Sequence, residues 1–422
     1  MKRLSLLTLA IAWSINCSAQ ISLNEYRHRV EEYSHSLAAT RWAIDGAEAD
    51  LRRARIGYLP RLDAAGDFYV NFRSQRTSDG SFIRPYSFGI SPVISARLYD
   101  GGATRAAVGV ASANVDIARA TEEFTALEVR YAADYAYWNL LATTHLSLAR
   151  DYYTRIVRSL REVVQARFDD GYTGRGDLLM VETQLSDAIY NQTVAQQTAI
   201  KALHNFNTLM GEATSTKWSP TDSLSVAPPK PQRVPIDTVM ARRPDVWSAI
   251  RSVDRAEWGV SAARAGYNPS IAMSVSASYA TVNPNIRTRM QLDGGAGVSL
   301  NIPIFAWGER RQAVRSARAV VVQSELALSE LLDQVRREEA DAWSDVEKTL
   351  DEVRQCEASL DIATENLSLS TFSYTEGQIA ILDVLSAQLS WIQLFTNAIS
   401  ARMAYRNALA TYARITGIPH NL

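Results

Sequence analysis

The sequence is poor in cysteine, and its two cysteines, Cys17 and Cys356, cannot form a disulfide in the mature chain. A charged start, an apolar stretch over 4–15 and small residues up to Ala19 are typical of a secretory signal peptide. We therefore expect residues 1–19 to be removed, which leaves Cys356 as the only cysteine in an oxidising compartment. The three residues before Cys17 fit a lipidation box poorly, so whether Cys17 carries lipid stays open.

Long apolar runs and net charge are also missing from the rest of the chain. No stretch of 18 or more apolar residues follows residue 19, which excludes a transmembrane helix. A chain of this kind enters a membrane only as a β-barrel. Lysine and arginine total 44 and aspartate and glutamate total 45, so no basic field attracts nucleic acid. The composition favours protein or lipid partners and no nucleic acid.

Groups of side chains that could carry out catalysis are absent from the sequence pattern as well. The five histidines are scattered, and none belongs to the H-E-x-x-H motif of a zinc site. No Gly-x-Ser-x-Gly nucleophile motif occurs. The acidic pairs Glu122-Glu123 and Glu338-Glu339 are adjacent in predicted helices, where neighbours point in different directions. We therefore expect no enzyme activity, no metal site and no cofactor.

The sequence does contain an internal repeat that covers nearly the whole chain. The segment 54–60 recurs at 263–269, a separation of 269 − 60 = 209 residues, and 98–101 matches 305–308, with 308 − 101 = 207. Five further positions recur with a separation of 206: Gly171 and Gly377, Asp177 and Asp383, Leu179 and Leu385, Leu203 and Leu409, Gly211 and Gly417. This spacing indicates a tandem duplication around a proline-containing linker at 212–234.

The two repeats, residues 20–211 and 235–422, have the same predicted order of elements. Each has a helix that ends at a proline (24–55 in the first repeat), a β-hairpin (61–99 and 270–305), a very long helix and a further helix. A helix of about 68 residues spans on the order of 100 Å, and two shorter helices of about 35 residues each sum to nearly the same length. We expect the short helices to stack end to end beside the long one, with the linker at mid-height.

Both predicted hairpins alternate apolar and polar residues with a period of two. The polar sides carry Asp63, Asp67, Asn71, Asp293 and Asn301. An antiparallel sheet packed on helices would give this pattern, and so would a membrane barrel with lipid outside and water inside. Four strands at the ends of very long helices favour the barrel, whose lumen these five residues would line. Because about eight strands are needed to close a packed barrel, closure must be shared among subunits.

Two aromatic residues lie where the predicted strands give way to helices. Trp307 and Tyr99 occupy near-equivalent positions in the two repeats. Tryptophan and tyrosine are enriched where a membrane meets water. We therefore expect both side chains at the membrane interface nearest the helices.

The repeated motifs resemble those of the TolC-type outer-membrane efflux proteins. The resemblance covers essentially the whole mature chain and rests on the Ala-x-x-Gly-Tyr-x-Pro segments at 54–60 and 263–269, on 243–245 (Arg-Pro-Asp), on Tyr374-x-x-Gly377 and on 383–385 (Asp-Val-Leu). It implies a mainly helical fold with a small β part. It also implies a homotrimer in which four strands from each subunit form a shared barrel of twelve, above a periplasmic α-barrel.

The same resemblance implies a location and a set of partners. The channel would lie in the outer membrane of a Gram-negative bacterium and extend into the periplasm as a passive duct. Its partners would be outer-membrane lipid, a periplasmic adaptor protein and an inner-membrane transporter that supplies the energy, of the RND or the ABC type.

The resemblance further implies a periplasmic gate closed by a ring of aspartates. Asp383 matches the first aspartate of that ring, and Ser386 stands where a second aspartate is often found. Tyr374 and Gly377 match the closing network. Carboxylates that converge on an axis would bind cations and raise one another's pKa. As the alternative, Asp383 is a helix N-terminal carboxylate that interacts with the helix dipole.

Two positions, Asp177 in the first repeat and Ile379 in the second, bear on how such a gate is held closed. Asp177 is the first-repeat equivalent of Asp383, and we interpret it chiefly as a helix cap. Ile379 stands where some family members have an arginine, so the expected ion pair with Asp177 is missing. The closed state must then be held differently, through Arg175 or Gln378.

The sequence does not identify the cargo. Small-molecule efflux and type I protein secretion both suit such a duct, and we expect efflux because it is the commoner function in the resembled family. A periplasmic adaptor would carry one helical hairpin flanked by β-rich domains, and a soluble coiled-coil protein would carry no alternating strands. The duplicated pattern argues against both.

Overall fold

The computed structural model describes residues 19–70, 72, 86–281 and 290–418. The chain forms two compact units. The tip unit comprises the described residues of 1–37, 126–239 and 336–422, and the sheet unit comprises those of 38–125 and 240–335. Residues 1–18 of the expected signal peptide, with Cys17, and the expected lumen residue Asn71 lie outside the described residues.

The described elements follow the same order twice along the chain. They are β1 (Ala19–Ile21), α1 (Leu23–Tyr33), α2 (His35–Ile56), β2 (Arg61–Val70), β3 (Tyr86–Tyr99), α3 (Ala103–Asp169), α4 (Arg175–Leu209), β4 (Trp218–Pro220), α5 (Ile236–Arg242), α6 (Pro244–Ala265), β5 (Ser270–Thr281), β6 (Met290–Asn301), α7 (Glu309–Thr375) and α8 (Ile381–Thr416). None of the helices in the described part combines the length and the apolar character that crossing a membrane requires.

The prediction of one helix over 24–55 is wrong, because the structure divides this stretch at Ser34 into α1 and α2. Ser34 is the C-cap of α1: its N–H still donates to the carbonyl of Val30 at 2.9 Å, but its ψ of 111° takes the chain out of the helix. Its Oγ accepts a hydrogen bond from the N–H of Leu37 at 3.3 Å. A serine side chain that bonds to nearby backbone competes with the continuous helix. In the second repeat, α5 and α6 are divided in front of Pro244, which has no N–H to continue the helix.

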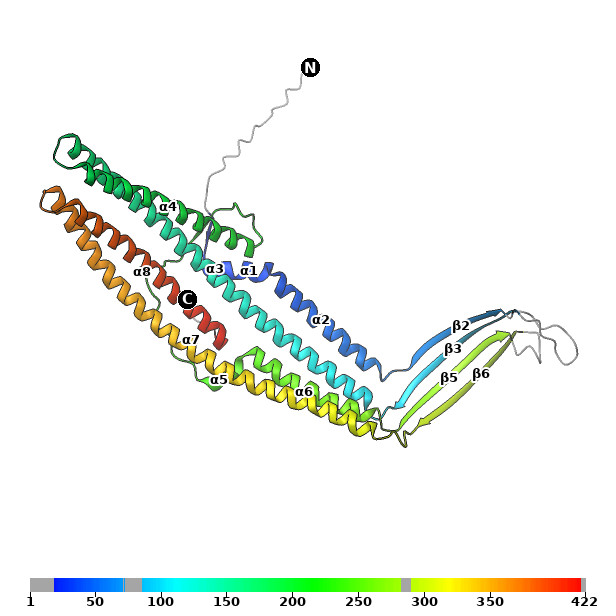
Figure 1. Ribbon diagram of the computed structural model, residues 1–422. Helices are drawn as coiled ribbons and strands as arrows, with labels where there is room; N and C mark the ends of the chain where they lie inside the picture. The colour runs from blue at the N-terminus through cyan, green and yellow to red at the C-terminus, as the bar shows by residue number, and fades with distance from the viewer. Residues whose placement is uncertain (1–18, 71, 73–85, 282–289, 419–422) are drawn as a thin grey trace, which may run out of the picture. The chain divides into compact units, whose positions relative to one another are not determined.

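The tip unit contains two helical hairpins, formed by the parts of α3 and α7 that follow residues 125 and 335 together with α4 and α8, and Figure 1 shows their connecting turns at the same end. Each turn contains a glycine with positive φ, 79° at Gly171 and 74° at Gly377. In each turn the glycine N–H and the next N–H donate to carbonyls in the last helical turn, as in a Schellman motif. Glycine therefore ends both long helices in the same way.

A shared apolar core joins the ends of the two hairpins. All four helices contribute buried side chains to it: Leu160 and Val164 from α3, Leu178 and Val181 from α4, Tyr374 from α7, and Ile381, Val384 and Leu385 from α8. Phe168 and Ile379 pack against this cluster. The tip is thus held chiefly by burial of apolar surface.

The linker between the repeats is fastened to the tip unit by polar contacts. Arg406 of α8 donates to the carbonyls of Ser223 and Val226 at 3.4 and 3.2 Å. Arg233, near the end of the linker, forms two hydrogen bonds with Glu339 of α7, at 3.0 and 2.8 Å. Because buried carbonyls and charges are costly unless paired, these contacts fix the path of the linker over the helices.

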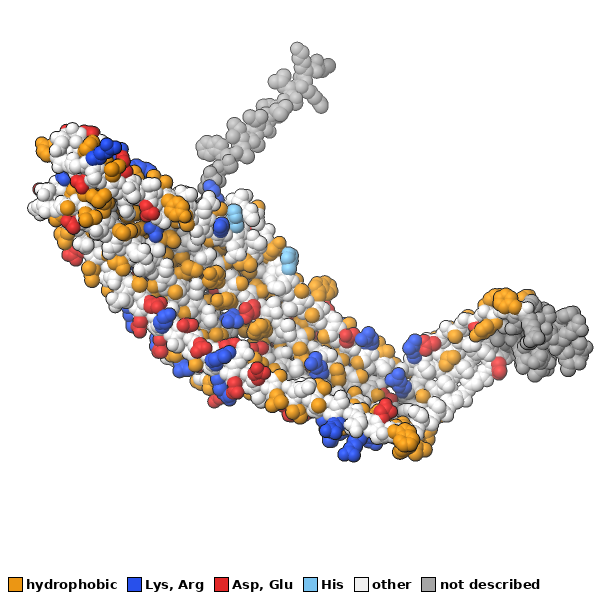
Figure 2. All heavy atoms as spheres, viewed as in Figure 1, with side chains coloured by type: hydrophobic (Ala, Val, Ile, Leu, Met, Phe, Trp, Pro, Cys, Tyr) orange, Lys and Arg blue, Asp and Glu red, His pale blue; other side chains and the backbone are white. Residues whose placement is uncertain are grey.

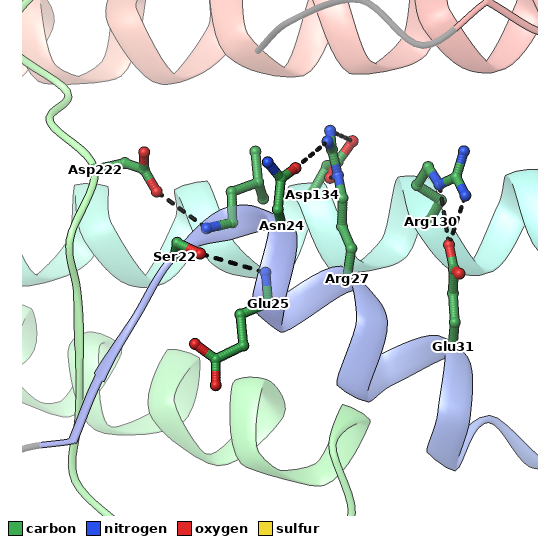
Figure 3. Close-up of polar contacts among 9 residues, drawn as sticks. Ser22, Asn24, Glu25, Arg27, Glu31, Arg130, Asp134 and Asp222 are labelled. Atoms are coloured by element: carbon green, nitrogen blue, oxygen red, sulfur yellow. Dashed lines mark hydrogen bonds and ion pairs between the residues drawn. The ribbon is translucent and has the colours of Figure 1, made fainter.

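A buried ion pair joins α1 to α3 (Figure 3). Arg27 extends from α1 to Asp134 of α3, whose side chain is 4% exposed, and its Nη2 donates to the Asp134 Oδ2 at 2.8 Å. The Arg27 Nε donates to the other carboxylate oxygen, so the pair is bidentate. Burial raises the pKa of the Asp134 carboxyl, and the hydrogen bond from Arg27 opposes that rise. Nearby, Arg130 pairs with Glu31 at 2.9 Å.

The sheet unit contains a four-stranded antiparallel sheet in the order β2-β3-β5-β6 (Figure 1). The outer pairings run from Arg61↔Ser95 to Val70↔Tyr86 and from Ser270↔Asn301 to Thr281↔Met290. Within the described residues, β2 and β6 are therefore the two edges of the sheet. An edge strand presents N–H and C=O groups that can pair with another chain.

Candidate functional site: a two-faced sheet and the tip of the helical hairpins

Polar and small residues of all four strands share one face of the sheet. Cross-strand partners in an antiparallel sheet lie on the same face, and the pairs run from Asp63 through Val93 and Ser276 to Gly295. Alternation along the strands then places three more of the predicted lumen residues on this face: Asp67, Asp293 and Asn301. Serines and glycines fill most of its remaining positions, which leaves a polar surface with few bulky side chains.

The opposite face of the sheet is apolar and uncovered within the sheet unit. Large side chains on it are 54–73% exposed, namely Leu62, Phe68, Ile90, Leu292, Val298 and Leu300. Every described side chain of β2 and β6 is exposed. The alternative of a sheet whose apolar face packs on helices is therefore wrong for this unit. A contiguous apolar face of this kind is unfavourable in water and favourable in lipid.

Exposed aromatic residues lie at the ends of the strands that adjoin the helices. A register shift between Arg97 and Tyr99 pairs Tyr99 with Ile271, so Tyr99 joins the apolar face although strict alternation would place it on the polar one. Trp307 is 92% exposed and has a φ of 46°, the only positive φ at a non-glycine among the described residues. Its ring lies 4.9 Å from that of Phe305. Both predicted interface residues are thus exposed at this end of the sheet unit.

At the tip, Asp383 lies in the first turn of α8, on the exposed side of the helix. Ser386, one turn further, is exposed on the same side, whereas Val384 and Leu385 are buried. The Asp383 carboxylate forms no hydrogen bond or ion pair with a described residue. It is therefore available to a cation or to groups of another chain, at a helix N-terminus that favours negative charge.

Asp177 has a different environment from its repeat equivalent. It lies in the first turn of α4, where the N-cap is Gly174, and its carboxylate accepts a hydrogen bond from the hydroxyl of Thr173. Asp177 is therefore not the N-cap itself, although it stabilises the start of the helix. The separation of 206 relates Thr173 to Ile379 (379 − 173 = 206), whose side chain packs on the apolar core. Asp383 consequently lacks the local hydroxyl that engages Asp177.

Arg167 makes a contact between the two hairpins that the sequence did not predict. From the last turn of α3, its Nη2 donates to the carbonyls of Tyr374 and Thr375 in α7, at 3.3 and 3.1 Å. Its guanidinium lies 4.5 Å from the centre of the Tyr374 ring, which is buried. The N–H of Gly377 already donates to the Tyr374 carbonyl, whereas no backbone N–H in the described part of the chain donates to Thr375. Arg167 therefore supplies a partner to the Thr375 carbonyl and joins α7 to α3.

Arg175 and Gln378 were expected to take the place of the missing family arginine, but neither makes a contact like that of Arg167. The side chains of Arg175 and Gln378 form no hydrogen bond or ion pair with a described residue. A basic residue in the last turn is a known feature of helix ends, but the carbonyls that Arg167 reaches lie 375 − 167 = 208 residues further along the chain. No local pattern reveals such a partner.

These features define a class of protein. A sheet with a lipid-compatible face and a polar face, on a chain whose long helical hairpins meet at a tip, is the wall of a membrane channel. The chain belongs to the outer membrane efflux protein family, whose model matches residues 27–212 and 236–418. The predicted likeness to TolC-type channels, the mainly helical fold with few strands and the location in the Gram-negative outer membrane, extending into the periplasm, are confirmed.

Individual relatives are similar over most of the chain. The outer membrane efflux protein BepC of Brucella suis is 23% identical over 83% of this chain and 75% of its own length. The alkaline protease secretion protein AprF of Pseudomonas aeruginosa is 26% identical over 86% of this chain and 78% of its own. The crystal structure of the Campylobacter jejuni CmeC outer membrane channel covers 94% of this chain and 85% of its own with a TM-score of 0.81 and 16% identity, which shows a common fold.

Proposed function

We propose that this chain is the outer-membrane duct of a tripartite export system and that it carries small toxic molecules out of the cell. The two-faced sheet is the observation that supports this most directly. Three copies joined edge to edge, β6 to β2, would close twelve strands, with the face of Asp63, Asp67, Asp293 and Asn301 toward the lumen and the apolar face toward lipid. The repeats 20–211 and 235–422 would then each supply half of a subunit's wall.

The duct is passive in this proposal, and its partners supply energy and selectivity. An inner-membrane transporter of the RND or ABC type would drive export, and a periplasmic adaptor would join it to the tip. The efflux name of BepC supports small-molecule cargo, whereas the secretion name of AprF favours type I protein secretion as the second candidate. Deletion of the gene in its host should increase susceptibility to toxic compounds. Unchanged susceptibility, with a protein missing from the culture medium, would support secretion instead.

The tip would be the gate of this duct. In a trimer, Asp383 from each copy would converge on the axis, with Ser386 one turn behind it and Tyr374 and Gly377 shaping the turn. Arg167 would hold the two hairpins of each subunit together in the closed state. The unengaged carboxylate of Asp383 supports this role, because a carboxylate without a local partner can bind a cation shared among subunits.

Asp383→Asn is expected to relieve block of the channel by divalent cations. Loss of three converging charges should raise the half-blocking Mg²⁺ concentration by about tenfold or more. The measurement is single-channel current in a planar bilayer, with Mg²⁺ added to the periplasmic side. Asp177→Asn is the matched control, because that carboxylate is engaged by Thr173, and it should leave the block unchanged. Equal block in the wild type and Asp383→Asn would remove Asp383 from the gate.

A further inference from the structure

An arginine-rich cavity lies in the sheet unit where α6 ends and α7 begins. Its volume is about 630 Å³, and it is lined by five arginines with Gly308 and Val314: Arg264, Arg310, Arg311, Arg315 and Arg318. Figure 2 shows Lys and Arg side chains gathered at this end of α7, beside hydrophobic side chains at the base of the sheet. No acidic side chain lines the cavity.

The charge of this cavity is not neutralised within the described part of the chain. None of the five arginines forms an ion pair or side-chain hydrogen bond with a described residue. The nearest acidic residue in sequence, Glu309, interacts with the hydroxyl of Tyr267. Elsewhere in the same unit arginines are paired, as Arg119 is with Glu48 at 2.8 Å and Arg251 with Asp254 at 2.8 Å. An unpaired group of guanidinium ions repels itself and attracts an anion with several oxygen acceptors.

The position of the cavity indicates where that anion comes from. Trp307, Phe305 and Ile304 are 73–92% exposed and directly precede α7. Exposed aromatic residues at the end of a membrane-facing sheet lie at the level of lipid headgroups. Arg311 and Arg315 lie in the first two turns of α7, about 3 and 9 Å along the axis from its start at Glu309. The flexible arginine side chains therefore reach the headgroup layer, which extends roughly 5–8 Å beyond the hydrocarbon.

We propose that this arginine cavity, defined by Arg264, Arg310, Arg311, Arg315 and Arg318, binds the phosphate of an anionic phospholipid in the periplasm-facing leaflet of the outer membrane. Planar guanidinium groups bind phosphate in bidentate fashion, and the cavity is large enough for a headgroup. The bound lipid would fix the depth of the sheet in the membrane at the junction of strand and helix. The proposal rests on the location of the family in the outer membrane and does not depend on the gate or the cargo.

The test measures lipid binding by the purified full chain in detergent. The probe is fluorescently labelled phosphatidylglycerol, titrated against the wild type and against Arg311→Gln/Arg315→Gln/Arg318→Gln. Each arginine near an anionic headgroup is expected to contribute about fivefold, so the triple variant should bind on the order of 100-fold more weakly. A matched control, Arg155→Gln/Arg158→Gln/Arg354→Gln, removes the same charge from the tip unit and should change affinity by less than about threefold. Labelled phosphatidylethanolamine, with no net charge, should bind weakly to all forms.

Other outcomes would overturn the proposal. Equal affinity of the wild type and the triple variant would exclude these arginines. If inorganic phosphate displaced the labelled lipid at a phosphate concentration similar to that of the lipid, the cavity would be a site for free anions. If the triple variant lost subunit association, measured in the same samples, but retained lipid, the cavity would be an interface between copies of the chain. Should the triple variant fail to fold, judged by circular dichroism, Arg315→Gln alone must still show about a fivefold loss.

Discussion

Arg167→Met is expected to hold the channel open far more often than the wild type. The substitution removes two hydrogen bonds from a charged donor to the carbonyls of Tyr374 and Thr375, and it removes the guanidinium from the Tyr374 ring. Such bonds contribute about 1.5–3 kcal/mol and a cation–π contact about 0.5–2 kcal/mol. Since Arg167 is partly exposed, we expect a net loss of about 2–3 kcal/mol, which changes the ratio of open to closed states by about 30- to 160-fold.

The readout is open probability in planar bilayers, supported by uptake of a bulky antibiotic in cells. Arg161→Met is the control, because Arg161 lies on the same helix but pairs with Glu182 of its own hairpin at 3.1 Å. That variant loosens α3 against α4 and leaves the contact between hairpins in place, so its open probability should remain near that of the wild type. Equal opening in the two variants would show that general loosening of the tip, and not the Arg167 contact, controls the gate.

Arg27→Met is expected to destabilise the tip unit by about 3–5 kcal/mol, because it leaves the buried Asp134 carboxylate without its partner. The matched control is Arg29→Met on the same helix. Arg29 pairs with Glu25 where the two side chains are 39% and 49% exposed, and its guanidinium lies 5.0 Å from the centre of the Trp218 ring, so its loss should cost about 1 kcal/mol, well below the effect of Arg27→Met. Denaturant unfolding of the purified protein, followed by circular dichroism, measures the difference.

The Arg27→Met variant should also depend on pH in a defined direction. Burial already raises the pKa of Asp134, and loss of Arg27 removes the main opposing interaction. A carboxyl whose folded-state pKa is raised favours folding while it is protonated, and that contribution is lost as the pH rises through the folded-state pKa. The variant should therefore be closest to wild-type stability at and below the ordinary pKa of the carboxyl, near 4, and should fall further behind as the pH rises through the raised folded-state pKa of Asp134. Arg27→Met/Asp134→Leu should recover most of the stability and lose this pH dependence.

The sequence predicted most of the fold because its main signals are periodic. Alternation with a period of two marks the strands, and the recurrence of 54–60 at 263–269 reveals the duplication without reference to any contact. The break at Ser34 was missed because serine also occurs within helices. The structure shows the break in the Ser34 ψ of 111°, where α1 ends, and in the hydrogen bond from the Leu37 N–H to the Ser34 Oγ, where α2 begins. The bulge that moves Tyr99 to the apolar face depends on its partner strand, which lies more than 170 residues away.

A site residue could be predicted from the sequence where a motif or the repeat marks its position. It could not be predicted where its role depends on a contact with a residue far away in the chain. Asp383 could be located from its repeat equivalent, but its lack of a local partner follows from the packing of Ile379 against the core. Arg167 carries no motif, because its partners are backbone carbonyls of another hairpin. The sequence shows a cluster of arginines near residue 310. Only the structure shows that no carboxylate of the described residues pairs with the arginines of the cavity.

The most direct test of the account is whether the two edge strands of neighbouring copies pair. Four variants in a Cys356→Ser background would each carry two cysteines, one in place of Ala65 in β2 and one at position 294, 295, 296 or 297 in β6. If β2 of one copy pairs with β6 of the next, the two cysteines lie close enough to form a disulfide in one of the four variants. A barrel shared by three copies predicts a covalent trimer, recovered with the outer membrane and converted to monomer by reductant. Monomer in every combination, or protein recovered in the soluble periplasmic extract, would contradict the shared barrel.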